Sequence, residues 1–239
     1  MEESGFLNIF KPPGMTSHDV VAYLRKRLKP RKIGHGGTLD PLACGVLVCL
    51  LNDATRRSAE FTGCSKTYVA EATFGVRTST GDLGGDILEN APCALTENDI
   101  LGVLPRFTGR IKQTPPMMSA VKVGGEKLYK LARRGVEVER KSREVEVSEL
   151  KVVRFYIAGG RPKALFEISC SGGTYVRTLI EDIGAALDAP AVTSFLVRTS
   201  VGRFGIEDSI SLRIAAETEN ALRYLKGDLP SDSIEGVEQ

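Results

Sequence analysis

The chain has 239 residues, a length that fits one large domain or two small ones. Its composition, with 42% apolar and 26% charged residues, is that of an ordinary globular protein. No apolar run reaches about 18 residues and the acidic start MEESGFLNIF lacks a positive region, so we expect neither a membrane span nor a signal peptide. Five scattered cysteines are typical of a protein of the reducing cytoplasm.

The net charge of +2 is distributed unevenly along the chain. Residues 207–239 hold eight acidic and three basic residues, so this end carries −5 and residues 1–206 carry +7. A basic body of this kind indicates a polyanionic partner, although a solvated charged face gives similar counts.

The N-terminal region predicts a strand followed by a helix. Residues 6–10 fit a strand, which the sequence KPPG ends. Thr16 or Ser17 is expected to cap a helix that runs to about Leu28. The end of this helix and the residues after it are strongly basic, which favours either phosphate contacts or plain solvation: Arg25, Lys26, Arg27, Lys29, Arg31 and Lys32.

Residues 33–46 read IGHGGTLDPLACGV and contain the first candidate site. Asp40 precedes a proline that restricts its backbone, and the glycine pair before it permits close approach to a ligand. The apolar run over residues 45–51 predicts a buried strand that anchors this loop. Asp40 is therefore interpreted either as a catalytic carboxylate held still by the core or as a turn residue that caps a nearby backbone N–H.

A short helix is expected around residues 53–61, before a half-buried strand over residues 66–74 in which apolar and polar residues alternate. Tyr68 in this strand fits either the core, with its hydroxyl satisfied, or a site. Residues 77–86 form a polar, glycine-rich loop that could reach an anion, but they match no nucleotide-binding motif.

The middle of the chain contains a predicted helix and a strongly basic segment. The helix covers about residues 96–104, with Thr96 and Asp99 placed as in a capping box. Between residues 122 and 143 there are eight bases and three acids, and apolar residues around Tyr129 suggest a short basic helix on an arm. Such an arm suits a groove that binds nucleic acid.

A long hairpin is predicted between residues 145 and 170, with its turn at a Gly-Gly pair. Thr174 is the expected N-cap of a helix that extends to about Leu187. Tyr175 and Arg177 therefore lie near a strand-to-helix junction, a common position for site residues.

Several stretches together resemble one family, the bacterial tRNA pseudouridine-55 synthases, or TruB family. The resemblance runs from about residue 6 to residue 210 and rests on the motifs KPPGMTSHDV (11–20), GHGGTLDPLACGVL (34–47), KTY (66–68), FGVRTSTGD (74–82), PPMMSAVK (115–122), GTYVRTL (173–179) and FLVRTSVG (195–202). The aspartate motif is the most specific of these. The resemblance therefore favours the catalytic interpretation of Asp40.

The resemblance implies a role for each matching position. Asp40 matches the family's catalytic aspartate, and Arg177 matches the arginine that pairs with that carboxylate. Tyr68 matches the tyrosine that stacks on the target base. Tyr175 matches an aromatic residue that lines the pocket, and Leu196 matches an apolar pocket wall.

Three further residues and one segment complete the implied site. His35 matches the residue that occupies the space left by a flipped-out nucleotide, with a general base as the second interpretation. Asp82 matches a supporting aspartate, and Lys66 is a substrate-binding candidate beside Tyr68. The basic segment around residues 112–143 resembles the family's RNA-gripping thumb insertion.

The implied chemistry agrees with these residue types. Isomerising uridine breaks an N-glycosidic bond and rejoins the same uracil through C5, so no cofactor and no metal is expected. The base must leave its stack for a pocket, where one positioned carboxylate acts on the sugar or the base. Asp40 could attack C1′, add to C6 or remove a sugar proton, and the sequence leaves these alternatives open. Cys44 and Cys49 are spaced unsuitably for a metal site.

The resemblance implies an α+β pseudouridine synthase fold, with a mixed, mainly antiparallel sheet flanked by helices around a basic cleft. We expect residues 1–211 to form the catalytic domain and residues 212–239 to form a short acidic tail, in place of the family's usual C-terminal PUA domain. Either tRNA affinity then rests on the catalytic domain and thumb, or the chain is truncated.

The expected activity is isomerisation of uridine 55 in the T-loop of tRNA by a cytoplasmic monomer that binds the T-stem-loop and no membrane. Two alternatives stay open: a pseudouridine synthase with another RNA target, and a non-catalytic RNA-binding or RNA-folding protein of the same fold. The second alternative would not need the Asp40–Tyr68–Arg177 set.

Overall fold

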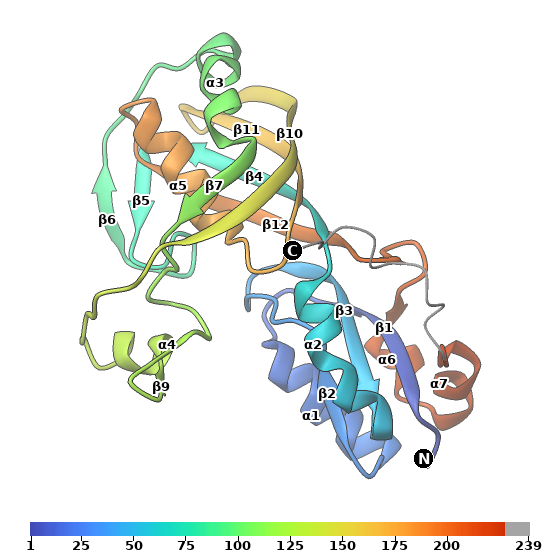
Figure 1. Ribbon diagram of the computed structural model, residues 1–239. Coiled ribbons are helices and arrows are strands. Elements are labelled where there is room, and N and C mark those ends of the chain that lie inside the picture. Colours follow the sequence, from blue (N-terminus) through green and yellow to red (C-terminus); the bar gives the residue numbers. More distant parts are fainter. Residues whose placement is uncertain (228–239) are drawn as a thin grey trace.

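The computed structural model describes residues 1–227, in which the main feature is a ten-stranded sheet (Figure 1). Its strands lie in the order Ile210–Ser211 (β14), Gly5–Lys11 (β1), Cys44–Leu51 (β3), Ala191–Val201 (β12), Lys66–Phe74 (β4), Arg161–Cys170 (β11), Arg143–Ala158 (β10) and Gly109–Gln113 (β7), with Ile33–His35 (β2) on β3 and Phe204–Gly205 (β13) on β12. The pairs β1–β14 and β3–β12 are parallel and the other pairs are antiparallel. The predicted α+β fold with a mixed, mainly antiparallel sheet is confirmed.

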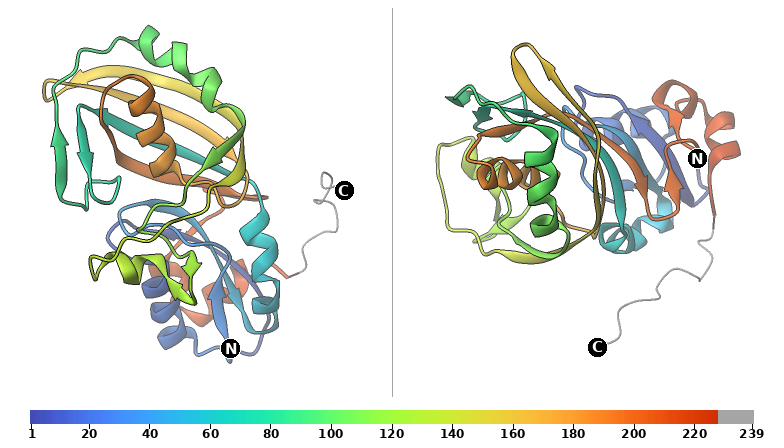
Figure 2. Two further views of the ribbon diagram at one scale, coloured as in Figure 1. Left: turned by 60° about the vertical axis from the view of Figure 1, so that its left-hand side comes forward. Right: turned by 90° about the horizontal axis from the view of Figure 1, so that it is seen from above.

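The sheet has two parts that meet where β3 runs beside β12 (Figure 1). The first part is covered by Ser17–Leu28 (α1), Leu212–Ala215 (α6) and Thr218–Tyr224 (α7) on one face and by Asn52–Arg57 (η1, a 3-10 helix) and Ser58–Gly63 (α2) on the other. The second part curves around Glu97–Val103 (α3), Leu104–Phe107 (η2, a 3-10 helix) and Val176–Ala186 (α5), which lie on the same face of it (Figure 2). No helix of residues 1–227 is long and apolar enough to span a membrane.

Local sequence signals account for the main elements. Thr96 and Asp99 form the predicted capping box at the start of α3, and Thr16, one of the two predicted caps of α1, forms a capping box with Asp19. All eight residues of β3 are buried, because this strand is covered on both faces.

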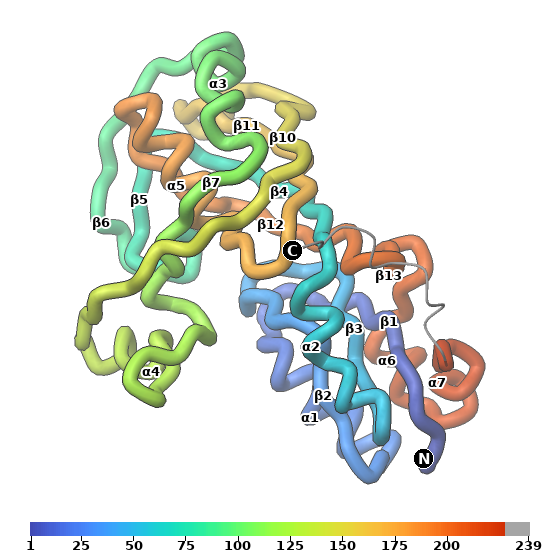
Figure 3. Tube along the Cα trace, viewed as in Figure 1, coloured from blue at the N-terminus to red at the C-terminus, as the bar shows by residue number. Residues whose placement is uncertain are grey.

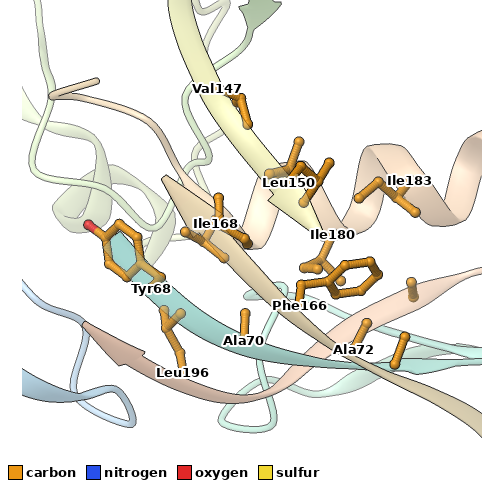
Figure 4. Packing of buried hydrophobic residues seen from close by; sticks show 14 of the residues in the cluster. Tyr68, Ala70, Ala72, Val147, Leu150, Phe166, Ile168, Ile180, Ile183 and Leu196 are labelled. Carbon is orange, nitrogen blue, oxygen red and sulfur yellow. The ribbon is translucent and has the colours of Figure 1, made fainter. Parts of the chain in front are cut away.

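The largest core cluster fills the space between the second part of the sheet and α5 (Figure 4). Ala70 and Ala72 on β4 leave room for larger side chains, among them Phe166 on β11 and Ile180 and Ile183 on α5, all of which are fully buried. This packing fixes the start of α5 relative to β4 and β12. The candidate site lies at that point.

Three predicted elements differ in detail from the structure. Tyr175, not Thr174, is the N-cap residue of α5, because the Thr174 hydroxyl donates instead to the Ser171 carbonyl at 3.0 Å. The helix expected around residues 53–61 begins as a 3-10 helix before it becomes α2. The loop expected at residues 77–86 is the connection of a hairpin formed by Val76–Thr78 (β5) and Ile87–Asn90 (β6).

Residues 114–142 leave β7 as an arm and return into β10 (Figure 3). The arm contains the short hairpin of Lys122–Val123 (β8) and Glu126–Lys127 (β9), followed by Leu128–Ala132 (α4). The predicted short helix on an arm is therefore present. Leu128 is fully buried, so the arm has an apolar anchor of its own.

Residues 212–227 pack against β1 through α6 and α7, in which Ala215 and Ala221 are fully buried. Phe6 and Lys226 form an isolated bridge at the end of this segment. The rest of the predicted acidic tail, residues 228–239, lies outside the described residues, so the proposed domain boundary stays a prediction.

The junction between the two parts of the sheet depends on Gly45. Its φ is +104°, and a Cβ at this position would lie 2.2 Å from the carbonyl oxygen of Arg198 on β12. Gly45→Ala should therefore cost about 3 kcal/mol or more of unfolding free energy, measured by urea denaturation. Gly102→Ala on α3 is the control, because a Cβ there meets no atom within 4 Å. An unchanged urea midpoint for Gly45→Ala would contradict this account of the junction.

Candidate active site

A cavity of about 310 Å³ lies where the loop before β3 meets β4, β12 and the start of α5. This volume is in the range of small-ligand sites. Six of the eight predicted site residues line the cavity: Asp40, Lys66, Tyr68, Tyr175, Arg177 and Leu196. Positions far apart in the sequence therefore meet at one place.

Asp40 lies in residues 36–43, which we call the Asp40 loop. Ser17 at the start of α1 fixes this loop, because its hydroxyl accepts from the Leu39 N–H at 2.8 Å and donates to the Leu39 carbonyl at 3.1 Å. On the other side of Asp40, the Gly14 N–H donates to the Pro41 carbonyl at 2.8 Å. The carboxylate itself bonds a guanidinium rather than capping a backbone N–H, so the turn interpretation lacks support among residues 1–227.

Arg177 is held in the first turn of α5 with 4% of its surface exposed. Its Nε donates to Asp40 Oδ2 at 2.7 Å. Its two terminal nitrogens donate to the main-chain carbonyls of Thr80 at 2.5 Å and Met118 at 2.9 Å. Because three acceptors fix the planar guanidinium, it holds the carboxylate in one orientation against the cavity.

Tyr68 and Leu196 come from neighbouring strands and form part of the cavity wall. Tyr68 on β4 is 7% exposed and Leu196 on β12 is 9% exposed, so their remaining surface faces the cavity that they line. A bulge in β12 between Thr193 and Phe195 changes the register, and Leu196 then pairs with Ala70. Burial raises the pKa of Tyr68, and this effect outweighs the nearby positive charge of Arg198, which lowers it. The Tyr68 hydroxyl is therefore neutral at physiological pH.

Tyr175 is the N-cap residue of α5, and its main chain is hydrogen-bonded to the Gln113 side chain. The Gln113 side chain accepts from the Tyr175 N–H at 3.0 Å and donates to its carbonyl at 3.2 Å. The guanidinium of Arg143 lies over the Tyr175 ring at 5.0 Å from its centre. This aromatic side chain is thus placed at the cavity with a cation on its face.

Lys66 lines the cavity, but its ammonium group is engaged elsewhere. It donates to the carbonyls of Phe61 and Thr62 at 3.1 Å and of Cys64 at 2.6 Å. These three acceptors use all three N–H groups of a lysine, which favours a structural role at the end of α2.

Lys66 should make stability depend on pH. Burial, aided by the charge of Arg198, lowers its pKa from 10.5 to about 8. Between these values the unfolded chain binds more protons than the folded chain, so the unfolding free energy contributed by Lys66 rises with pH. Between pH 7 and pH 11, the unfolding free energy of wild type should therefore rise by about 3 kcal/mol relative to that of Lys66→Met, as measured by urea denaturation. A pH-independent difference between the two proteins would refute this assignment.

His35 and Asp82 do not line this cavity. His35 on β2 accepts from the Gly37 N–H through Nδ1 at 3.3 Å, and burial lowers its pKa, which keeps the ring neutral at physiological pH. Asp82 accepts from Thr80 Oγ1 at 2.6 Å and from the Gly84 N–H at 3.0 Å. It lines a smaller cavity that also reaches Asp40 and Arg177, so it lies behind the ion pair. Their predicted roles toward RNA stay predictions.

Two arginines of the cavity wall, Arg143 and Arg198, were not among the predicted site residues. Arg143 precedes the predicted hairpin and was counted only among the bases of the predicted RNA-binding arm, yet it lines the cavity and donates to the Gly173 carbonyl at 2.5 Å. Arg198 lies two residues after Leu196 in the motif FLVRTSVG and is only 1% exposed. The motif itself was the available signal for Arg198.

The long mixed sheet with this cavity at its middle has the fold of a pseudouridine synthase. Solved structures agree with this class. The chain resembles the crystal structure of a Cbf5-Nop10-Gar1 complex, with a TM-score of 0.69 and 35% identity over 89% of this chain and 53% of that chain. It also resembles an H/ACA RNP bound to a substrate RNA containing 2′-deoxyuridine, with a TM-score of 0.65 and 31% identity. It spans about half the length of these solved chains.

The chain belongs to the TruB family of pseudouridylate synthases, as the resemblance of its motifs implied. The model of the family's N-terminal domain matches residues 25–176. The chain is 49% identical to tRNA pseudouridine synthase B of Moorella thermoacetica, over 87% of this chain and 68% of that protein. It is 46% identical to the protein of the same name from Symbiobacterium thermophilum, over 98% of this chain and 80% of that protein.

Proposed function

We propose that the protein is a tRNA pseudouridine(55) synthase, which isomerises uridine 55 in the T-loop of tRNA to pseudouridine. The observation that carries this proposal is the pair of buried Arg177 and partly exposed Asp40, at 2.7 Å, in the wall of a cavity large enough for a nucleobase. A non-catalytic RNA-binding protein has no need for a carboxylate held in this way.

The reaction needs one bond broken and one bond formed. The C1′–N1 bond of uridine breaks and its electron pair stays on uracil; after the ring turns, C5 bonds to C1′, the C5 proton leaves and N1 gains a proton. Asp40 supplies the carboxylate that acts on the sugar or the base. Tyr68, Tyr175 and Leu196 supply flat and apolar surfaces that suit a base taken out of its stack.

The relatives favour tRNA as the substrate. The names of relatives at 42–50% identity refer to tRNA, whereas the solved structures at 35% and 31% identity are a Cbf5-Nop10-Gar1 complex and an H/ACA RNP. We accordingly expect a cytoplasmic monomer that binds the T-stem-loop. The arm of residues 114–142, anchored by Leu128 beside the cavity residues Ser119 and Val121, is the proposed thumb that contacts RNA.

The proposal is tested with a tRNA transcript whose uridines carry tritium at C5. Because isomerisation expels the C5 proton, the protein should release one equivalent of tritium to water per tRNA. A transcript with cytidine in place of uridine 55 is the control and should release none. Tritium release from both transcripts would show that the target is a uridine other than uridine 55. No tritium release from either transcript would refute the enzyme proposal.

A further inference from the structure

We propose that Arg198 supplies the buried positive charge that stabilises uracil when it leaves the ribose, while also fixing the Asp40 loop for this step. The inference rests on the proposed isomerisation of uridine. It assigns a reaction role to a residue that the sequence analysis passed over.

The first argument is the position of the guanidinium. Arg198 Nε donates to the Val46 carbonyl on β3 at 2.9 Å. Its terminal nitrogens donate to the carbonyls of Thr38 and Gly37, each at 3.2 Å. Arg198 therefore ties β12 to β3 and to the backbone immediately ahead of Asp40.

The second argument is the absence of a compensating acid. Arg198 is 1% exposed and lines the cavity, yet no acidic group of residues 1–227 forms an ion pair with it. A buried charge without a partner costs stability, so its presence favours a role in function. Three of its five N–H groups are used by the carbonyls and its guanidinium also hydrogen-bonds the Tyr68 side chain, which leaves one N–H group for a further acceptor.

The other cations of the cavity wall are less suited to the task. Arg177 is compensated by Asp40. All three N–H groups of Lys66 are bonded to carbonyls, so none is left for a base. Arg143 is only half-buried and stacks on Tyr175, so water screens its charge. Arg198 is thus the cation of this wall that combines burial, no acidic partner among residues 1–227 and an N–H group that no carbonyl uses.

The third argument comes from the reaction. When the C1′–N1 bond breaks, the electron pair remains on uracil and spreads over N1, O2 and O4. A fixed, buried cation in the cavity wall stabilises this charge more than it stabilises neutral uridine, and so lowers the barrier. The positive charge of Arg198 also helps to lower the pKa of His35 and the pKa of Lys66. Its electrostatic effect therefore extends to other groups around the site.

The test separates charge from structure with three variants. Arg198→Met removes the charge and the donors, Arg198→Gln removes the charge and keeps a donor, and Arg198→Lys keeps the charge. Single-turnover pseudouridine formation should fall about 10²–10³-fold in the Met and Gln variants, with tRNA affinity within about threefold of wild type. Arg198→Lys should recover at least about tenfold of the lost rate. Exposed Arg203→Met, in the turn that follows the same strand, is the matched control and should keep the wild-type rate.

A thermal melt of each variant identifies the folded proteins, and Arg198→Gln serves if Arg198→Met does not fold. Equal rate losses in the Lys and Gln variants would overturn the proposal and leave a structural role alone. A wild-type rate in Arg198→Gln would overturn it as well. Failure of the proposed function is distinguishable, because wild type would then form no pseudouridine at all.

Discussion

Asp40→Asn should lower pseudouridine formation by about 10⁴-fold or more, because an amide keeps the shape of the carboxylate but cannot act as nucleophile or base. The Asp40 loop should keep its conformation, since its anchors are the Ser17 and Gly14 hydrogen bonds rather than the carboxylate. Single-turnover assays on tRNA transcripts measure the rate, and filter binding measures the affinity, which should stay within about threefold.

Asp53→Asn is the matched control for this prediction. Asp53 pairs with Arg31 at 2.9 Å on the exposed surface, so its loss should leave the rate unchanged and stability within about 1 kcal/mol. A residual rate in Asp40→Asn close to that of wild type would remove Asp40 from the reaction.

Arg177→Met should lower both stability and rate. The substitution leaves Asp40 without its ion-pair partner and leaves the carbonyls of Thr80 and Met118 without their donors, which should cost about 3–5 kcal/mol of unfolding free energy. Because the carboxylate then loses its fixed orientation, the single-turnover rate should fall by about 10³-fold. Urea denaturation and the transcript assay measure the two effects separately.

Arg177→Lys tests the geometry of this pair. A lysine keeps the charge but cannot reach three acceptors in one plane, so its rate should lie between those of wild type and Arg177→Met. Arg56→Met is the surface control, since Arg56 is 81% exposed and contacts Asp53 only at 3.8 Å. If Arg177→Met kept the wild-type rate, the ion pair would be structural only.

Much of the fold follows from local signals in the sequence. The cap at Thr16, the capping box at Thr96, the apolar run of β3 and the alternation of β4 each depend on residues close together in the chain, and each prediction is confirmed. The N-cap of α5 was predicted one residue too early, because Thr174 has the chemistry of a cap but its hydroxyl turns back to Ser171.

The site needed more than local signals. Asp40 and Arg177 are 137 residues apart, and only the family resemblance placed them together in advance. Arg198 lies in a strand where an arginine is usually solvated, and its burial depends on how β12 crosses β3. The bulge that sets the register of Leu196 is likewise a property of strand pairing, which periodicity cannot supply.

The central claim is that a uridine drawn into the Asp40 cavity becomes pseudouridine at one position of tRNA. Base-resolution pseudouridine mapping of an unmodified tRNA transcript, after incubation with wild-type protein, tests it most directly. We expect a single new pseudouridine at position 55. Pseudouridine at another position would contradict the substrate assignment, and its absence from the whole transcript would contradict the claim itself.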